Sequence, residues 1–163
     1  MAEKIQLDAL YERLKHFRTA MLTTVSPQGD IHSRPMMTQE REPDADLWFV
    51  SSLNADHVRE IQAHSKVGVI YFHDSDNSYV SLAGDARVVT DREFLRSRWH
   101  EDWRAWFPEG PDQADLCMIK VEPHEAEYWE PRGGRIRVMF ELARGKLTGT
   151  HPEINPPVRG EIR

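Results

Sequence analysis

The chain has 163 residues, of which 39% are hydrophobic and 29% charged, and its formal net charge is -6. This length suits a single domain over 1–163 with a hydrophobic core of its own. The acidic balance argues against a nucleic-acid surface, which needs a basic footprint, and no apolar run is long enough to span a membrane. Because the N-terminus lacks a signal-peptide pattern, we expect a cytoplasmic protein.

The spacing of apolar residues predicts a mainly β chain with short helices, in which hairpins join most of the strands. We expect helices at 5–17, 55–64, from 91 toward 99, and 136–143, and a mostly irregular tail from about 145. Thr90 and Glu93 have the spacing of a capping box for the third helix. Strands are expected at 20–25, 31–37, 47–51, 67–72, 79–89, 116–121 and 125–130, with a kink or bulge at Gly84. Strands joined in this way favour an antiparallel barrel that the helices cap.

The strand expected at 31–37 has an unusual composition, because Pro35 removes one hydrogen-bond donor from it. Such a strand belongs at a sheet edge, with Arg34 extended beside the proline. Two interpretations remain open. Arg34 is either a solvated arginine on an ordinary edge, or it binds a phosphate while Met36 and Met37 contact a flat ring.

Other chemistry has weaker support. The histidines are too scattered for a zinc helix, and the motifs of phosphate loops, dinucleotide sites and serine hydrolases are absent, so we expect no metal site and assign no catalytic residue. Cys117 lies among apolar residues and is expected to be a buried small hydrophobe. An aromatic cluster over 99–107 is either core, a pocket wall or a dimer contact. The arginines over 132–137 either bind an anionic ligand or are solvated.

Taken together, five segments resemble the flavin-binding split barrels related to pyridoxamine 5′-phosphate oxidase, most closely the general stress protein 26 branch. They occur in the same order and spacing: 33–36, 77–81, 84–88, 105–112 and 127–129. The resemblance implies a six-stranded antiparallel split β-barrel of Greek-key type. It also implies a homodimer that binds one FMN per protomer between the subunits, with FAD as another possible ligand.

The resemblance also implies roles for individual residues. Arg34 matches the arginine that faces the flavin phosphate. The other cofactor-binding positions that it implies are Pro35, Met36, Met37, Thr38, Val50, Ser51, His57, Tyr79, Trp106 and Trp129. Arg135 and Arg137 match positions that bind the substrate in the oxidases.

Two departures from the pattern concern the phosphate and the substrate. Asp56 and His57 replace a basic pair near the phosphate, which leaves fewer cations there, although a protonated His57 would restore one. Met139 replaces an arginine, which argues against true pyridoxamine 5′-phosphate oxidase activity. We therefore expect an FMN-dependent oxidoreductase with an unknown small-molecule substrate. The alternatives are a flavin carrier or sensor without turnover, and a split barrel that binds FAD, a deazaflavin or a haem.

Overall fold

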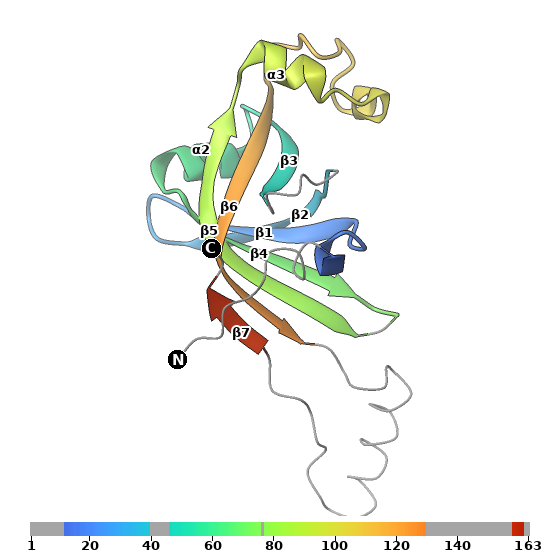
Figure 1. Cartoon of the computed structure of the whole chain (residues 1–163). Coiled ribbons are helices and arrows are strands. Elements are labelled where there is room, and N and C mark those ends of the chain that lie inside the picture. The colour runs from blue at the N-terminus through green and yellow to red at the C-terminus, as the bar shows by residue number, and fades with distance from the viewer. Residues whose placement is uncertain (1–11, 40–45, 76, 130–157, 162–163) are drawn as a thin grey trace, which may run out of the picture.

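The computed structural model describes residues 12–39, 46–75, 77–129 and, for the backbone only, 158–161. One antiparallel sheet dominates the fold, and short helices flank it (Figure 1). The strands are β1 Thr19–Val25, β2 Ile31–Met37, β3 Leu47–Ser52, β4 Lys66–His73, β5 Ser78–Val89, β6 Leu116–Trp129 and β7 Val158–Glu161. The helices are α2 Asp56–Ala63, α3 Arg92–Ser97 and the 3₁₀ helix η1 Glu101–Ala105. None of the described helices is long and apolar enough to cross a membrane.

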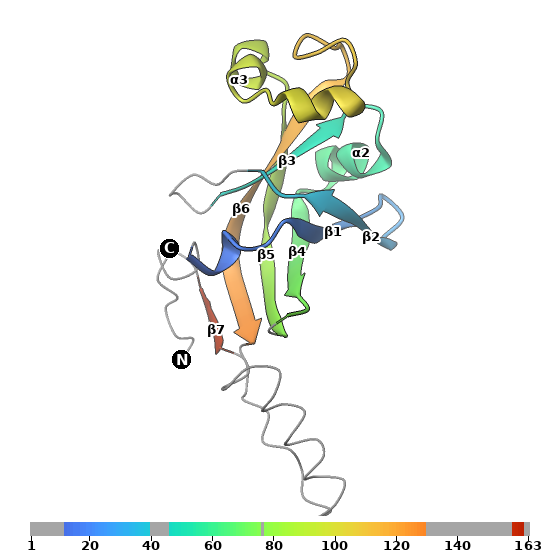
Figure 2. The same cartoon turned by 90° about the vertical axis from the view of Figure 1, so that its right-hand side faces the viewer.

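The sheet has the strand order β2-β1-β4-β5-β6-β3, and β7 pairs with β6 beside this path. The sheet curls so that its two edge strands approach each other, as Figure 2 shows. Where β2 ends, the backbone N–H of Gln39 donates to the carbonyl oxygen of Trp48 in β3 at 3.3 Å. The result is the split barrel that the family resemblance implied, with β2 at an edge as Pro35 requires.

β5 and β6 are the longest strands, and an irregularity between them bends the sheet. Their register shifts between Ala83 and Gly84, so that His124 of β6 is left without a partner on β5. A Cβ at Gly84 would lie 2.6 Å from the carbonyl oxygen of Glu122, which explains why only glycine fits there. The bulge predicted at Gly84 is therefore confirmed, and β6 continues through Pro123 as one strand.

The buried side chains form two clusters. The larger cluster fills the curl of the sheet, where alternating residues of β1, β3, β4 and β5 point inward and α2 packs against them. The smaller cluster lies under α3 and η1 at one end of the long strands (Figure 1). Trp103 and Phe107 are buried in it, and Trp99 packs against it. Most of the aromatic cluster is thus core.

Several predicted boundaries need correction. The N-cap of α3 is Asp91, whose side chain accepts from the backbone N–H of Phe94, and not Thr90. The tail that was expected to be mostly irregular contributes β7, which adds a seventh strand to the six of the expected split barrel. The helix expected at 136–143 and most of the opening helix lie outside the described residues, which begin with helical residues at 12–14.

Candidate functional site

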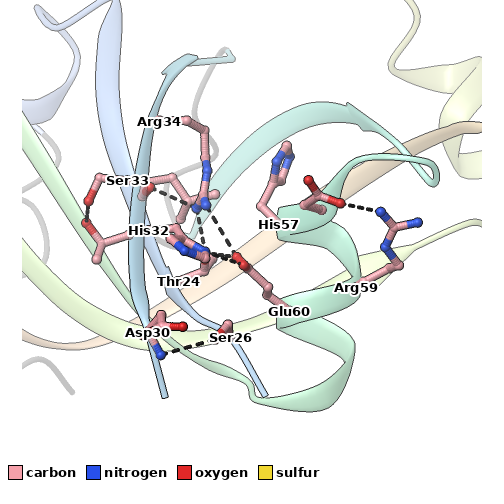
Figure 3. A network of polar contacts seen from close by, with 12 residues as sticks. Thr24, Ser26, Asp30, His32, Ser33, Arg34, His57, Arg59 and Glu60 are labelled. Atoms are coloured by element: carbon pink, nitrogen blue, oxygen red, sulfur yellow. Dashed lines mark hydrogen bonds and ion pairs between the residues drawn. The ribbon is translucent and has the colours of Figure 1, made fainter. Parts of the chain in front are cut away.

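A buried carboxylate on α2 organises the candidate site. Glu60 is only 6% exposed, and it reaches from the helix to the inner face of β1 and β2, as Figure 3 shows. Its Oε2 accepts from the hydroxyl of Thr24 and lies 3.3 Å from Nη2 of Arg34. Its Oε1 lies 2.6 Å from Nδ1 of His32. Burial disfavours the charge of Glu60, but the hydrogen bonds from Thr24 and His32 and the charge of Arg34 outweigh it, and the pKa of Glu60 lies below its usual value.

Arg34 is held by several acceptors of the protein itself. Its side chain is 20% exposed. Nη1 donates to the carbonyl oxygen of Leu22 at 3.2 Å and to the hydroxyl of Thr24 at 2.6 Å, while Nη2 contacts Glu60. The interpretation of Arg34 as a solvated arginine on an ordinary edge strand is therefore wrong. The guanidinium is partly buried and its orientation is fixed.

Ser51 and His57 form a second polar pair beside Arg34. The hydroxyl of Ser51 lies 2.8 Å from Nε2 of His57, and Ser51 is buried at the end of β3. Burial, helped by the nearby charge of Arg34, lowers the pKa of His57 despite the opposing effect of Glu60 and Asp56. His57 is thus neutral at pH 7 in this structure, and it does not supply the cation that its protonation would have provided.

The start of α2 adds further hydrogen-bond donors. Its N-cap, Ala55, makes no side-chain cap, and His57 lies in the first turn. The positive end of the helix dipole therefore lies close to Ser51 and His57. Together with Arg34, these groups can bind an anion of phosphate size.

Two predicted residues lie on the inner side of the sheet and have structural partners there, and a third points to the other face of β3. Met36 packs against the larger cluster. The hydroxyl of Thr38 donates to the carbonyl oxygen of Phe17 at 2.9 Å. Val50 packs against the smaller cluster, so its side chain does not join that of Ser51.

Other predicted residues lie on the opposite, outer face of the sheet. Neighbouring positions of the strands bring large apolar side chains together there, and Phe72 and Tyr79 stack with their ring centroids 4.7 Å apart. We call this surface the outer apolar face, and it consists of Met21, Pro35, Met37, Ile70, Phe72, Tyr79 and Trp129. Because β2 is an edge strand, a ligand can contact Arg34 on one side and this face on the other by passing around the edge.

The remaining candidate residues are not brought close to Arg34 or to the outer apolar face. Trp106 follows η1 and is 60% exposed. Arg135 and Arg137 lie outside the described residues. Cys117 is buried as predicted, and burial raises the pKa of its thiol to about 12. Within the ranges that the structure covers, no three histidine, cysteine or acidic side chains are grouped as metal ligands.

Sequence reasoning missed Glu60, His32 and Thr24, because no motif or spacing in the sequence connects them. Thr24 and Glu60 are 36 residues apart in the chain, and their contact depends on how α2 packs against the sheet. A glutamate in a short amphipathic helix is ordinarily solvent-exposed, so no local signal distinguished this one.

Comparisons with known proteins agree with this fold. The sequence profile of the family described as pyridoxamine 5′-phosphate oxidase like matches residues 6–153. General stress protein 26 of Bacillus subtilis (strain 168) is 25% identical over 132 residues, which is 79% of this chain and 91% of that protein.

Solved structures give the same result. The crystal structure of a putative general stress protein 26 from Jannaschia sp. CCS1 superposes with a TM-score of 0.70 at 27% identity, covering 93% of this chain and 94% of that one. The general stress FMN/FAD binding protein of Xanthomonas citri superposes with a TM-score of 0.65 at 22% identity, covering 76% of this chain and 87% of that one.

Proposed function

Since the chain belongs to the pyridoxamine 5′-phosphate oxidase-like family, in its general stress protein 26 branch, we propose that it binds FMN and uses it in redox chemistry. Among its structural relatives, the protein of Xanthomonas citri is described as binding FMN or FAD. The flavin would supply electron transfer, and the protein would supply binding and orientation.

The convergence of Arg34, Ser51 and His57 at the start of α2 carries this proposal. These groups fit a phosphate, because they offer a guanidinium, a hydroxyl and an imidazole beside the positive end of a helix. Pro35 and Met37, one and three positions beyond Arg34 on the same strand, offer an apolar surface to the flavin ring. Pro35, Met37, Tyr79 and Trp129 are the ring-side residues in this proposal.

We also propose that the flavin site is completed by a second copy of the chain. The outer apolar face exposes large side chains, which favours a partner that covers them. A symmetric dimer would bury this face twice, once from each copy. The flavin would then lie at the edge of the interface, next to β2.

Titration of the purified protein with FMN tests this function. Binding should quench the fluorescence of the flavin, with a dissociation constant in the micromolar range or below. Bovine serum albumin at the same concentration serves as the control for non-specific quenching. If FMN at micromolar concentrations leaves both fluorescence and absorbance unchanged, the proposal is wrong.

Turnover is a separate question from binding. We propose that the flavin-loaded protein is an oxidoreductase that acts on a small molecule. FAD is an alternative cofactor, because the same residues fit it if its adenosine half extends into solvent. Steady-state oxidation of NADH or NADPH well above that of free flavin would support an oxidoreductase. Flavin binding without any such turnover would instead support the carrier or sensor.

A further inference from the structure

The carboxylate of Glu60 pairs with the guanidinium of Arg34, which is the cation that a flavin phosphate would need. Both terminal nitrogens of Arg34 donate to acceptors of the protein, and one of these acceptors is the Glu60 carboxylate, 3.3 Å from Nη2. Thr24 contacts both side chains, because its hydroxyl accepts from Nη1 and donates to Oε2. Arg34 is thus already paired with an anion before any ligand binds.

The other charges near Arg34 do not change this balance. On α2, Asp56 forms an ion pair with Arg59, so these two charges cancel. His57 is neutral at pH 7. His32 lies on the other side of Glu60 and is half-exposed, and its contact at 2.6 Å is with the carboxylate and not with the place a phosphate would occupy. The positive charge of Arg34 is therefore matched by the negative charge of Glu60.

A phosphate monoester carries close to two negative charges at neutral pH. In this site, such a group would meet a guanidinium that is already neutralised, and it would lie near the Glu60 carboxylate in a partly buried place where charges are poorly screened. Riboflavin has the same ring and the same ribityl chain but no phosphate. It would gain nothing from Arg34, and it would lose nothing to Glu60.

We propose that Glu60 determines the ligand specificity of the flavin site, by pairing with Arg34 and so suppressing the preference for FMN over flavins without a charged phosphate. This inference rests on the proposed flavin binding. In this proposal Glu60 affects how the phosphate of the ligand binds, and it does not contact the reacting ring. The wild-type protein is then expected to bind FMN less than about tenfold more tightly than riboflavin.

Glu60→Gln tests the proposal, because it removes the negative charge and keeps a side chain of the same shape. The dissociation constants of FMN and riboflavin are measured by fluorescence quenching at pH 7.5, and circular dichroism establishes that the variant is folded. Arg34 then becomes available to a phosphate. The preference for FMN over riboflavin should rise by about tenfold or more, through tighter binding of FMN.

Glu93→Gln is the matched control. It removes the same charge from the chain at an exposed position of α3, away from Arg34, and it should leave the ratio of the two dissociation constants unchanged. An unchanged ratio in Glu60→Gln would overturn the proposal. So would a wild-type protein that prefers FMN by more than about a hundredfold, a result that does not depend on whether the variant folds. If neither flavin binds to the wild type, the proposed function fails, and this inference fails with it.

Discussion

Arg34 is the residue that would bind the phosphate of FMN. Its removal weakens FMN binding in two ways. Arg34→Ala removes the guanidinium, and it leaves the buried carboxylate of Glu60 without its arginine partner. We predict that FMN binds at least about tenfold more weakly to this variant, whereas the affinity for riboflavin changes by less than about threefold. Flavin titration by fluorescence quenching measures both constants.

Arg59→Ala is the control for this prediction, because Arg59 is an exposed arginine on α2 that pairs only with Asp56 among the described partners. Both flavins should bind to it as they bind to the wild type. Equal weakening of FMN and riboflavin in Arg34→Ala would mean that Arg34 supports the fold of the site and does not contact the phosphate.

Gly84 is a residue whose structural role can be tested against a second glycine. We predict that Gly84→Ala lowers the free energy of unfolding by about 1–3 kcal/mol, because its Cβ would lie 2.6 Å from the backbone of β6. In Gly68→Ala, the nearest atom to the new Cβ is the Cβ of Thr23 at 3.6 Å, an ordinary contact, so stability should change little. Urea denaturation measures both variants. Similar losses in the two variants would contradict the role assigned to the bulge.

At the scale of elements, local patterns were enough to locate β1 to β6. β2 has the predicted bounds, Ile31–Met37, and its proline places it at the sheet edge as expected. Alternation of apolar residues and turn chemistry are local signals, which is why the hairpins were predictable. The position of Asp91 at the start of α3 was missed because Thr90, the residue before it, has the same capping chemistry.

β7 was missed for a different reason. It is a short strand in a tail rich in proline, and it forms only by pairing with β6, a strand that ends about 30 residues earlier in the chain. Such pairing is set by the shape of the finished sheet and leaves no periodic pattern in a four-residue segment. Short strands added to an existing edge are therefore poorly predictable from sequence.

The lowered pKa values of His57 and Glu60, both on α2, make the stability of the fold a function of pH in our prediction. The unfolded chain protonates His57 below its ordinary pKa of 6.5 and Glu60 below 4.5, whereas the folded protein takes up these protons only at lower pH. In both windows the unfolded state binds more protons, so stability falls as the pH falls. We predict that the urea midpoint decreases in two steps between pH 7 and pH 3.

Two variants separate the steps. His57→Gln should remove the decrease that begins below pH 6.5. Glu60→Gln should make the decrease below pH 4.5 smaller without abolishing it, because folding also lowers the pKa values of Glu101 and Asp115. The measurement is urea denaturation followed by circular dichroism at half-unit pH intervals. The role of His57 would be contradicted if the urea midpoint of His57→Gln fell between pH 7 and pH 5 as much as that of the wild type.

At the scale of the whole molecule, the general architecture was predictable and the division of the site between two faces was not. The order of hairpins, together with the family resemblance, led to the split barrel. Arg34 and Pro35 are neighbours in sequence, yet one points to the inner face and the other to the outer face, as side chains alternate along a strand. The curl of the complete sheet decides which of these two side chains lies on the inner face.

The outer apolar face links this architecture to assembly. Four of its side chains are 39–48% exposed, and they lie on adjacent positions of three neighbouring strands: Met21, Ile70, Phe72 and Tyr79. The edge of the same face carries Pro35 and Met37, which the proposed function places against the flavin ring. A second copy on this face would therefore both bury apolar surface and enclose the ligand.

Ile70→Glu tests the assembly, because Ile70 is 44% exposed within the outer apolar face and a charge there would be buried without a partner in a dimer. We predict that the wild type sediments as a dimer and that Ile70→Glu sediments as a folded monomer with at least about tenfold weaker FMN binding. Gln62→Glu adds the same charge at an exposed position of α2 and should remain a dimer. The shared site would be contradicted if the wild type sedimented as a monomer at micromolar concentration. It would also be contradicted if a monomeric variant bound FMN with full affinity, because the flavin would then need only one copy of the chain.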